Sequence, residues 1–285
     1  MVRLAGESRR IARHIKLSPP GADDPVILCY EEGRGEETPL LLIPGLGDTV
    51  WSWRKLVPAL PTGHRTLAVE PRGQGRSASP AGPYTVAQMA EDLARLAGEV
   101  GMERPVLIGH GLGARCALLL AIERPALPAG LVLLGAETGP PAGEARRALT
   151  ERMECARRGD MNAAYRALKA EGGLPRGMSP KERAEHHRIF LTADPAGHAA
   201  CCAAELGAPH LADRLEEVAC PALAIAGELD ETRHPEAERL AEGVPGGEAV
   251  VVAGAGRFVQ LEAPEALRTL LGEFLRKHSL STPGK

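Results

Sequence analysis

The residues best placed to support chemistry in this 285-residue chain form a glycine-rich turn from Gly109 to Gly113, with the sequence GHGLG. A short apolar run, 106–108, precedes the turn and has the length and the β-branched content of a buried strand. The segment 114–124 follows it, is rich in Ala and Leu, and favours a helix. A strand, a glycine turn and a helix in this order hold ligands or reactive groups at the carboxyl end of a parallel sheet.

The turn has two interpretations with different chemistry. As a G-x-G-x-x-A turn it matches a dinucleotide-binding loop, and the next strand, 131–134, ends near an acidic residue, Glu137. As a G-x-nucleophile-x-G turn it matches a nucleophile elbow, with Gly111 where a serine would stand. In a dinucleotide-binding domain the acidic residue lies roughly 20 residues after the glycine loop, and Glu137 lies further along the chain than that. The sequence on either side of the turn has to distinguish these two interpretations.

The elements that must position this turn alternate between strand and helix. Possible edge strands lie around 10–17 and 26–31, and the stronger pattern then begins. Buried strands are predicted at 40–43, 66–69, 106–108 and 131–134, and helices at 50–60, 85–100 and 114–124. Alternation at this spacing predicts a parallel sheet with right-handed crossovers.

The pattern changes after Glu137, where only helical segments are predicted: 144–157, 161–171, 180–191 and 197–206. Alternation then resumes, with strands at 222–226 and 249–253 and helices at 235–242 and 264–277. A helical insertion of this length between two α/β portions predicts a cap over a site. We therefore predict an α/β core at 1–137 and 216–278, a helical cap at 138–215 and a flexible tail at 279–285.

Composition narrows the class of partner. A formal net charge of -3 gives no reason to expect nucleic acid or an anionic membrane as partner. No apolar run approaches the ~18–20 residues needed to span a bilayer, and the first 17 residues lack the apolar segment of a secretory signal. The histidines at 186, 187 and 198 have no carboxylate or cysteine at metal-ligand spacing. We expect a cytoplasmic protein with a small-molecule or peptide substrate, and no metal or other cofactor.

Taken in chain order, the motifs resemble those of the α/β-hydrolase superfamily over nearly the whole chain. The pieces are the loop PGLGD at 44–48, the turn RGQGRS at 72–77, the elbow at 109–113, the helical cap, the strand end GELD at 227–230 and the tail AGRFVQLE at 255–262. They are similar to the superfamily's oxyanion loop, elbow, acid loop and base loop, and a dinucleotide-binding domain would explain neither 72–77 nor the tail. The resemblance implies a mostly parallel sheet flanked by helices, with an inserted helical cap.

The resemblance also implies that the catalytic triad is degenerate. Hydrolysis by this fold needs a Ser nucleophile, an Asp and a His base, in that chain order. The Ser position is Gly111, which has no side chain, and the His position is Arg257, which stays protonated and accepts no proton. Only the acid position, Asp230, matches. Triad hydrolysis is therefore not expected.

The backbone donors of the superfamily's oxyanion hole do not depend on side-chain identity. The resemblance assigns them to Leu46 and Leu112, so the hole can still form and stabilise an enolate. It would lie at a helix N-terminus, which favours negative charge further. We expect Leu46, Gly111 and Leu112 to form the floor of a substrate pocket beneath the cap.

Three charged residues are candidates for roles beside this floor. Asp230 and Arg257 occupy positions that meet in the superfamily, and Arg257 either pairs with Asp230 or clamps a substrate carboxylate. Glu137 follows the strand where some members place an alternative acid. It is either a charge at the hinge of the cap or a general base, and Asp230 is the other candidate for that base.

Three aromatic residues, His110, Trp51 and Trp53, are candidates for contact with a substrate. His110 neighbours Gly111, and it either packs inside the fold with a hydrogen bond or touches the substrate. Trp51 and Trp53 open the segment beside the oxyanion loop. Because the chain has only three Phe and three Tyr, we expect one of these tryptophans, Trp51 first, to line the pocket.

Three functions from different classes remain. The first is a non-hydrolytic tailoring enzyme (isomerase, epimerase, lyase or cyclase) that acts on a carbonyl-containing small molecule or peptide while the substrate supplies its own acid or base. Some members of the superfamily in bacterial natural-product biosynthesis work without the usual triad. The second is an inactive pseudoenzyme that binds a ligand or partner. The third is a hydrolase in which Glu137 or Asp230 activates a water. The first is our prediction.

Overall fold

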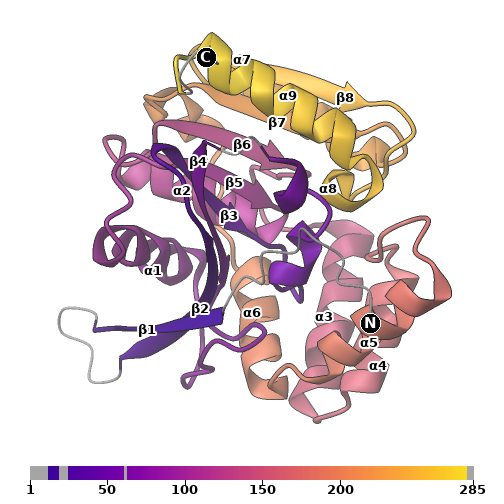
Figure 1. The fold of residues 1–285 in the computed structure, drawn as a ribbon. Coiled ribbons are helices and arrows are strands. Elements are labelled where there is room, and N and C mark those ends of the chain that lie inside the picture. The colour runs from indigo at the N-terminus through magenta and orange to yellow at the C-terminus, as the bar shows by residue number, and fades with distance from the viewer. Residues whose placement is uncertain (1–11, 19–24, 61–62, 281–285) are drawn as a thin grey trace, which may run out of the picture.

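A computed structural model describes residues 12–18, 25–60 and 63–280 of the chain. Figure 1 shows a central sheet with helices packed on both faces and a further group of helices on one side. Residues 1–11, which include the start of the first predicted edge strand, residues 19–24 and 61–62, and residues 281–285 of the predicted tail lie outside the described residues.

The sheet has eight strands in the order β1-β2-β4-β3-β5-β6-β7-β8. Strand β2 runs antiparallel to β1 and β4, and every pair from β4 across to β8 is parallel. The strands are β1 Ala12–Leu17, β2 Val26–Gly33, β3 Glu37–Ile43, β4 His64–Glu70, β5 Val106–His110, β6 Gly130–Leu134, β7 Ala222–Gly227 and β8 Glu248–Val252. This mostly parallel sheet confirms the predicted fold class.

Helices cover both faces of the sheet, which is why the central strands are continuously apolar. Every residue of β5 and β6 is buried. One face packs against α1 Val86–Glu99, α2 Leu112–Glu123 and α7 His234–Gly243, and the other packs against α9 Pro264–Lys277. Helix α1 confirms the helix predicted at 85–100: it begins with a capping box between Thr85 and Gln88 and buries an apolar stripe that starts at Val86.

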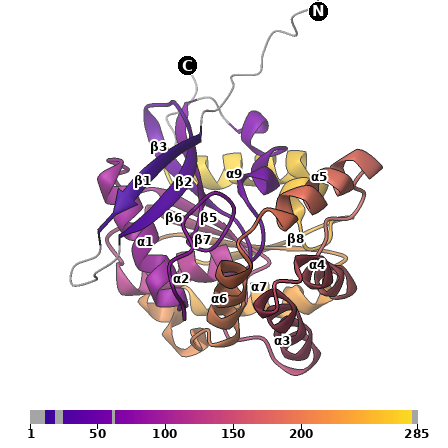
Figure 2. The same ribbon diagram turned by 90° about the horizontal axis from the view of Figure 1, so that it is seen from below.

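Four helices lie between β6 and β7, where the sequence predicts a helical insertion. They are α3 Gly143–Arg157, α4 Met161–Ala170, α5 Pro180–Leu191 and α6 Pro195–Leu206. Figures 1 and 2 show them grouped on one side of the molecule. They share a small core of their own, built around Tyr165, Phe190 and Cys202. We call these four helices the cap.

The prediction of a single helix at 50–60 is wrong. The segment forms two short 3-10 helices, η1 Val50–Trp53 and η2 Val57–Ala59. Pro58 has no backbone N–H to donate within a continuous helix, so the helical path is interrupted and restarts there. Three other short helices, η3 Ala212–Glu217, η4 Glu231–Arg233 and α8 Val259–Glu262, were not predicted because they are too short to show a helical period.

In the part of the chain that the structure describes, no helix combines the length and the apolar character required to cross a membrane. This agrees with the absence of a long apolar run in the sequence.

The N-terminus of α2 packs directly on the end of β3. A Cβ atom at Gly113 would overlap the carbonyl oxygens of Ile43 and Pro44, so only glycine allows this approach. At Gly98 of α1, by contrast, a Cβ would meet nothing within 4 Å. These two helical glycines therefore serve different purposes.

We predict that Gly113→Ala destabilises the protein by about 2 kcal/mol or more, because it forces α2 away from β3. The matched change Gly98→Ala lies in an exposed helical position and should stabilise it by about 0.5–1 kcal/mol. Urea unfolding followed by circular dichroism measures both. Equal effects of the two substitutions would contradict the close packing of α2 on β3.

Candidate active site

The turn between β5 and α2 keeps the backbone shape of a nucleophile elbow without a nucleophile. Gly111 has φ 51° and ψ −116°, a conformation that strains residues with a side chain. Its N–H donates to Leu134 O at 3.0 Å, which anchors the turn to β6. A Cβ at this position would have open space, since the nearest atom is Gly45 Cα at 3.9 Å. The space that a serine would occupy is therefore present.

Two backbone donors border this space. The N–H groups of Leu46 and Leu112 have no acceptor among the described residues. The neighbouring N–H of Gly47 is occupied, because it donates to Gln74 Oε1 at 2.6 Å. Gln74 is buried and belongs to the turn at 72–77, so this turn holds the oxyanion loop in place. Both unpaired N–H groups belong to residues that line the cavity described next.

A cavity of about 850 Å³ lies between this floor and the cap. Its floor includes Gly45, Leu46, Gly111 and Leu112, and α3 and α4 contribute much of the opposite wall. The wall is strongly charged: it contains Asp48, Glu137, Glu144, Glu151, Glu171, Glu205, Arg152, Arg166, Arg233 and Arg257.

Asp230 and Arg257, which the sequence resemblance assigns to the triad acid and base positions, form an ion pair. Arg257 Nε lies 3.2 Å from Asp230 Oδ2, and the Thr232 hydroxyl donates to Oδ1 at 2.9 Å. The Arg257 side chain is about one-third exposed, at 32%, and lines the cavity. The pairing alternative is thus present in the structure, while Asp230 lies behind the cavity wall.

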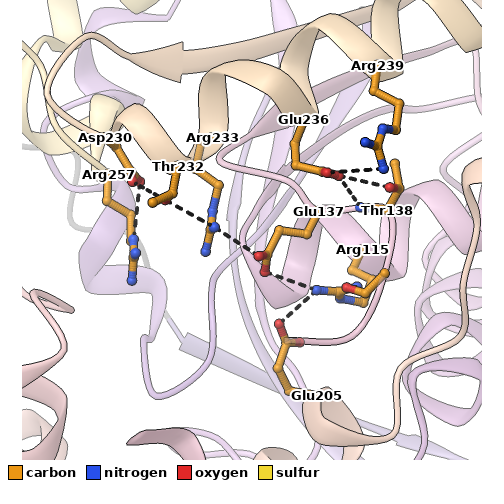
Figure 3. A network of polar contacts seen from close by, with 11 residues as sticks. Arg115, Glu137, Thr138, Glu205, Asp230, Thr232, Arg233, Glu236, Arg239 and Arg257 are labelled. Carbon is orange, nitrogen blue, oxygen red and sulfur yellow. Dashed lines mark hydrogen bonds and ion pairs between the residues drawn. The ribbon is translucent and has the colours of Figure 1, made fainter. Parts of the chain in front are cut away.

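Glu137 lies between two guanidinium groups. Its carboxylate is 2.9 Å from Arg233 Nη1 and 3.2 Å from Arg115 Nη2. Arg115, whose side chain is only 1% exposed, also contacts Glu205 of the cap at 3.1 Å. Figure 3 shows these contacts as a continuous network from Arg257 to Glu205. Such a network compensates the cost of burying Arg115.

His110 points into the fold beside the floor. Its Nε2 lies 3.2 Å from the backbone oxygen of Arg257, which only accepts hydrogen bonds, so Nε2 carries the proton. The ring packs against Phe258 at a centroid distance of 4.8 Å, and both residues line the cavity. Burial lowers the pKa of His110, which keeps the ring neutral at neutral pH.

Trp51 is placed away from the cavity wall formed by the described residues. Its ring stacks under the Arg54 guanidinium at 3.3 Å and lies 5.2 Å from the His186 ring. Trp53 is fully buried in the core. The aromatic surface of the cavity comes from Phe258 instead.

Among the charged residues of the described cavity wall, sequence reasoning identified only Glu137 and Arg257 and missed the others, including Asp48, Arg152 and Arg233. Asp48 could have been identified from the sequence, because it is the last residue of the glycine loop at 44–48. Arg152 could not, since α3 holds several arginines and only its burial, at 4% exposure, sets it apart. No group of three or more metal-ligating side chains occurs among the described residues.

Comparison with known proteins agrees with this geometry. The family model described as the alpha/beta hydrolase family matches residues 40–270. A "Putative carbamate hydrolase RutD" of Rhizobium rhizogenes strain K84 is 28% identical over 256 residues, covering 86% of this chain and 95% of that protein. The protein of the same name from Variovorax paradoxus strain S110 is 40% identical over 123 residues. That match covers 42% of this chain and 46% of the relative, so it spans about half of the relative's length.

Solved structures share the fold over nearly their full length. A thermophilic esterase from Thermogutta terrifontis has a TM-score of 0.83 at 27% identity, covering 95% of this chain and 100% of that chain. An enol-lactonase from Burkholderia xenovorans LB400 has a TM-score of 0.78 at 25% identity, with coverage of 88% and 97%. The family predicted from the motifs is thereby confirmed.

We predict that Arg257→Ala lowers the free energy of unfolding by about 1.5–3 kcal/mol, because it removes a charged hydrogen-bond donor from the largely buried Asp230. The control Arg268→Ala removes an exposed pair with Glu265 and should cost less than about 1 kcal/mol. Thermal and urea unfolding measure both. An Arg257→Ala protein as stable as the wild type would show that the pair contributes nothing to folding.

Proposed function

Because this chain belongs to the alpha/beta hydrolase family, we propose that it uses the family's oxyanion hole without the family's nucleophile, as a non-hydrolytic enzyme. The reaction is proton transfer at the carbon next to a carbonyl group, as in an isomerase, epimerase or lyase. One observation carries the proposal: the elbow at Gly111 keeps its shape and its two free N–H donors while the nucleophile position is empty of a side chain.

The chemistry follows from what the hole stabilises. When a base removes the α-proton of a bound carbonyl compound, negative charge moves to the carbonyl oxygen. The N–H groups of Leu46 and Leu112 would stabilise that charge, as would the N-terminus of α2. Gly111 offers no atom that could attack the carbonyl carbon, so no acyl-enzyme competes. A proton returned to the carbon completes the reaction.

The names of the relatives support a second candidate, hydrolysis. It would require a water activated by a carboxylate, since neither Gly111 nor Arg257 can act as nucleophile or base. Of the two carboxylates predicted for that role, only Glu137 lines the cavity. Both candidate reactions use the same oxyanion donors. In the first a base removes an α-proton, whereas in the second an activated water attacks the carbonyl carbon.

We predict α-proton exchange as the measurable activity. N-acetylcysteamine thioesters of 2-substituted carboxylic acids, incubated with the protein in deuterated water, should lose their α-proton signal in the NMR spectrum faster than in buffer. Leu46→Pro removes one oxyanion donor and should slow exchange about 100-fold or more. The control Leu46→Ala keeps the N–H and should retain the activity.

A wild-type protein that exchanges none of these thioesters, yet binds the oxyanion mimic 4-nitrophenolate, would contradict the enzyme proposal. The inactive binding protein would then be the better account. If Leu46→Pro exchanges as fast as Leu46→Ala, the oxyanion hole takes no part in the reaction.

We predict that the wild type neither reacts covalently with a fluorophosphonate nor hydrolyses 4-nitrophenyl acetate. Gly111→Ser alone should gain little, because Arg257 cannot accept the proton of the new serine. Adding Arg257→His supplies a base next to Asp230 and should raise hydrolysis by about tenfold or more over the single variant. Serine labelling of the wild type would contradict the assignment of Gly111. Wild-type hydrolysis without labelling, abolished by Glu137→Gln, would instead establish the water-activating candidate.

A further inference from the structure

We propose that Asp48 is the acid–base residue of this site and that His110 is the residue that positions its proton. The proposal rests on the proposed function and names the group that moves the α-proton. It replaces the two carboxylates that the sequence favoured, Asp230 and Glu137, with one that the sequence did not single out.

Charge pairing within the cavity wall distinguishes Asp48 from the other buried carboxylates. Among the described residues, Glu137, Glu205 and Glu171 lie 2.9 Å, 3.1 Å and 3.7 Å from arginine nitrogens. Asp48 is 8% exposed and has no arginine or lysine within ion-pair distance in the described chain. Its neighbours are two imidazole rings. Because a carboxylate held by a guanidinium gives up that pairing when it takes a proton, Asp48 is the better proton acceptor.

The contact with His110 can accommodate a proton that Asp48 takes up. His110 donates from Nε2 to the Arg257 backbone, so Nδ1 of the neutral ring has only a lone pair. This Nδ1 is buried without a hydrogen-bond partner and lies 3.8 Å from Asp48 Oδ2. Two acceptors at this distance repel one another, and a proton between them removes the repulsion. The Asp48–His110 pair can therefore hold a transferable proton.

The second carboxylate oxygen of Asp48 faces the cap. Oδ1 lies 3.6 Å from His186 Nε2, and His186 Nδ1 lies 3.2 Å from the Tyr165 hydroxyl. With the hydroxyl donating to Nδ1, the ring directs its Nε2–H at Asp48 and stabilises the ionised carboxylate. Asp48 thus has a proton donor on the side of the cap and a proton acceptor on the side of the elbow.

Asp48 is also close to where the reacting carbon must lie. It closes the turn of the oxyanion loop, since its N–H donates to Gly45 O at 3.1 Å, and it follows the donor Leu46 by two residues. An ideal Cβ at Gly45 would lie 2.8 Å from His110 Nδ1, and Gly45 Cα borders the empty position at Gly111. The pair therefore lies at the edge of the space beside the two N–H donors.

The proposed step is balanced without any co-reactant. The substrate C–H bond breaks and its proton forms an O–H bond with Asp48. The electron pair forms a carbon–carbon double bond, and the charge moves to the carbonyl oxygen in the oxyanion hole. Return of the proton to carbon from Asp48 regenerates the carboxylate. Reprotonation on the other face or at another carbon gives epimer or isomer.

The test compares Asp48→Asn with the exposed control Asp213→Asn in the thioester exchange assay. Asp48→Asn should slow exchange about 100-fold or more, as expected for loss of a general base. It should still bind 4-nitrophenolate. Asp213→Asn should behave as the wild type. Wild-type exchange by Asp48→Asn, or loss of exchange in Glu137→Gln instead, would overturn the assignment.

A second measurement does not depend on turnover. Calorimetric titration with 4-nitrophenolate, in buffers of different ionisation enthalpy, should show proton uptake by the wild type and none by Asp48→Asn. If the wild type takes up a proton but exchanges no thioester, the proposed function fails while the role of Asp48 in holding a proton stands. Equal uptake by both proteins would refute that role.

His110→Gln tests the positioning role and provides a second variant should Asp48→Asn not fold. Glutamine keeps a donor for the Arg257 backbone and removes the Nδ1 acceptor. The titratable groups that contact Asp48 among the described residues are His110 and His186, and the charges of Arg257 and Asp230 act on His110. His110→Gln should move the pH midpoint of proton uptake, and an unchanged midpoint would show that His110 does not share the proton.

Discussion

The architecture of the site depends on the contact between the start of α2 and the end of β3. A Cβ at Gly109 would meet the backbone of Ala114, and a Cβ at Gly113 would meet carbonyl oxygens of β3. These contacts fix the path of the turn from both sides and thereby fix the N–H of Leu112. The residue between them, Gly111, has open space at its Cβ position. The placement of these backbone donors therefore does not depend on a side chain at Gly111.

Charge is the second organising feature. With Arg257 at the position of the base, Asp230 keeps a partner for its carboxylate, and the contacts continue through Glu137 to Arg115 and the cap. Each of these charged groups forms an ion pair with a group of opposite charge, so most of the buried charge in the wall is compensated by the protein. Asp48 is the exception among the described buried carboxylates of the wall. A polar cavity with one uncompensated acid beside two N–H donors is suited to moving a proton.

The sheet and the cap helices could be predicted because their information is local. Apolar runs such as 106–108 and helix starts such as Ser179 before Pro180 are visible in a few consecutive residues. The prediction that Gly111 and Arg257 stand at the Ser and His positions of the triad rests on motif order. The contacts of Asp48 with His110 and His186 join the oxyanion loop, the elbow and the cap, and no local pattern encodes them. Likewise, the orientation of Trp51 is decided by Arg54 and by His186 of the cap, which is distant in sequence.

The buried guanidinium of Arg115 has a consequence for how the cavity can be entered. It belongs to the core helix α2, yet one of its two carboxylate partners, Glu205, comes from α6 of the cap. Lifting α6 from the core would leave a nearly inaccessible cation with half of its counter-charge, a loss of several kcal/mol. Helix α6 is therefore a fixed support rather than part of a lid. The exposed rim of the cavity lies on α3 and α4, which carry Glu144, Glu151 and Arg166 there.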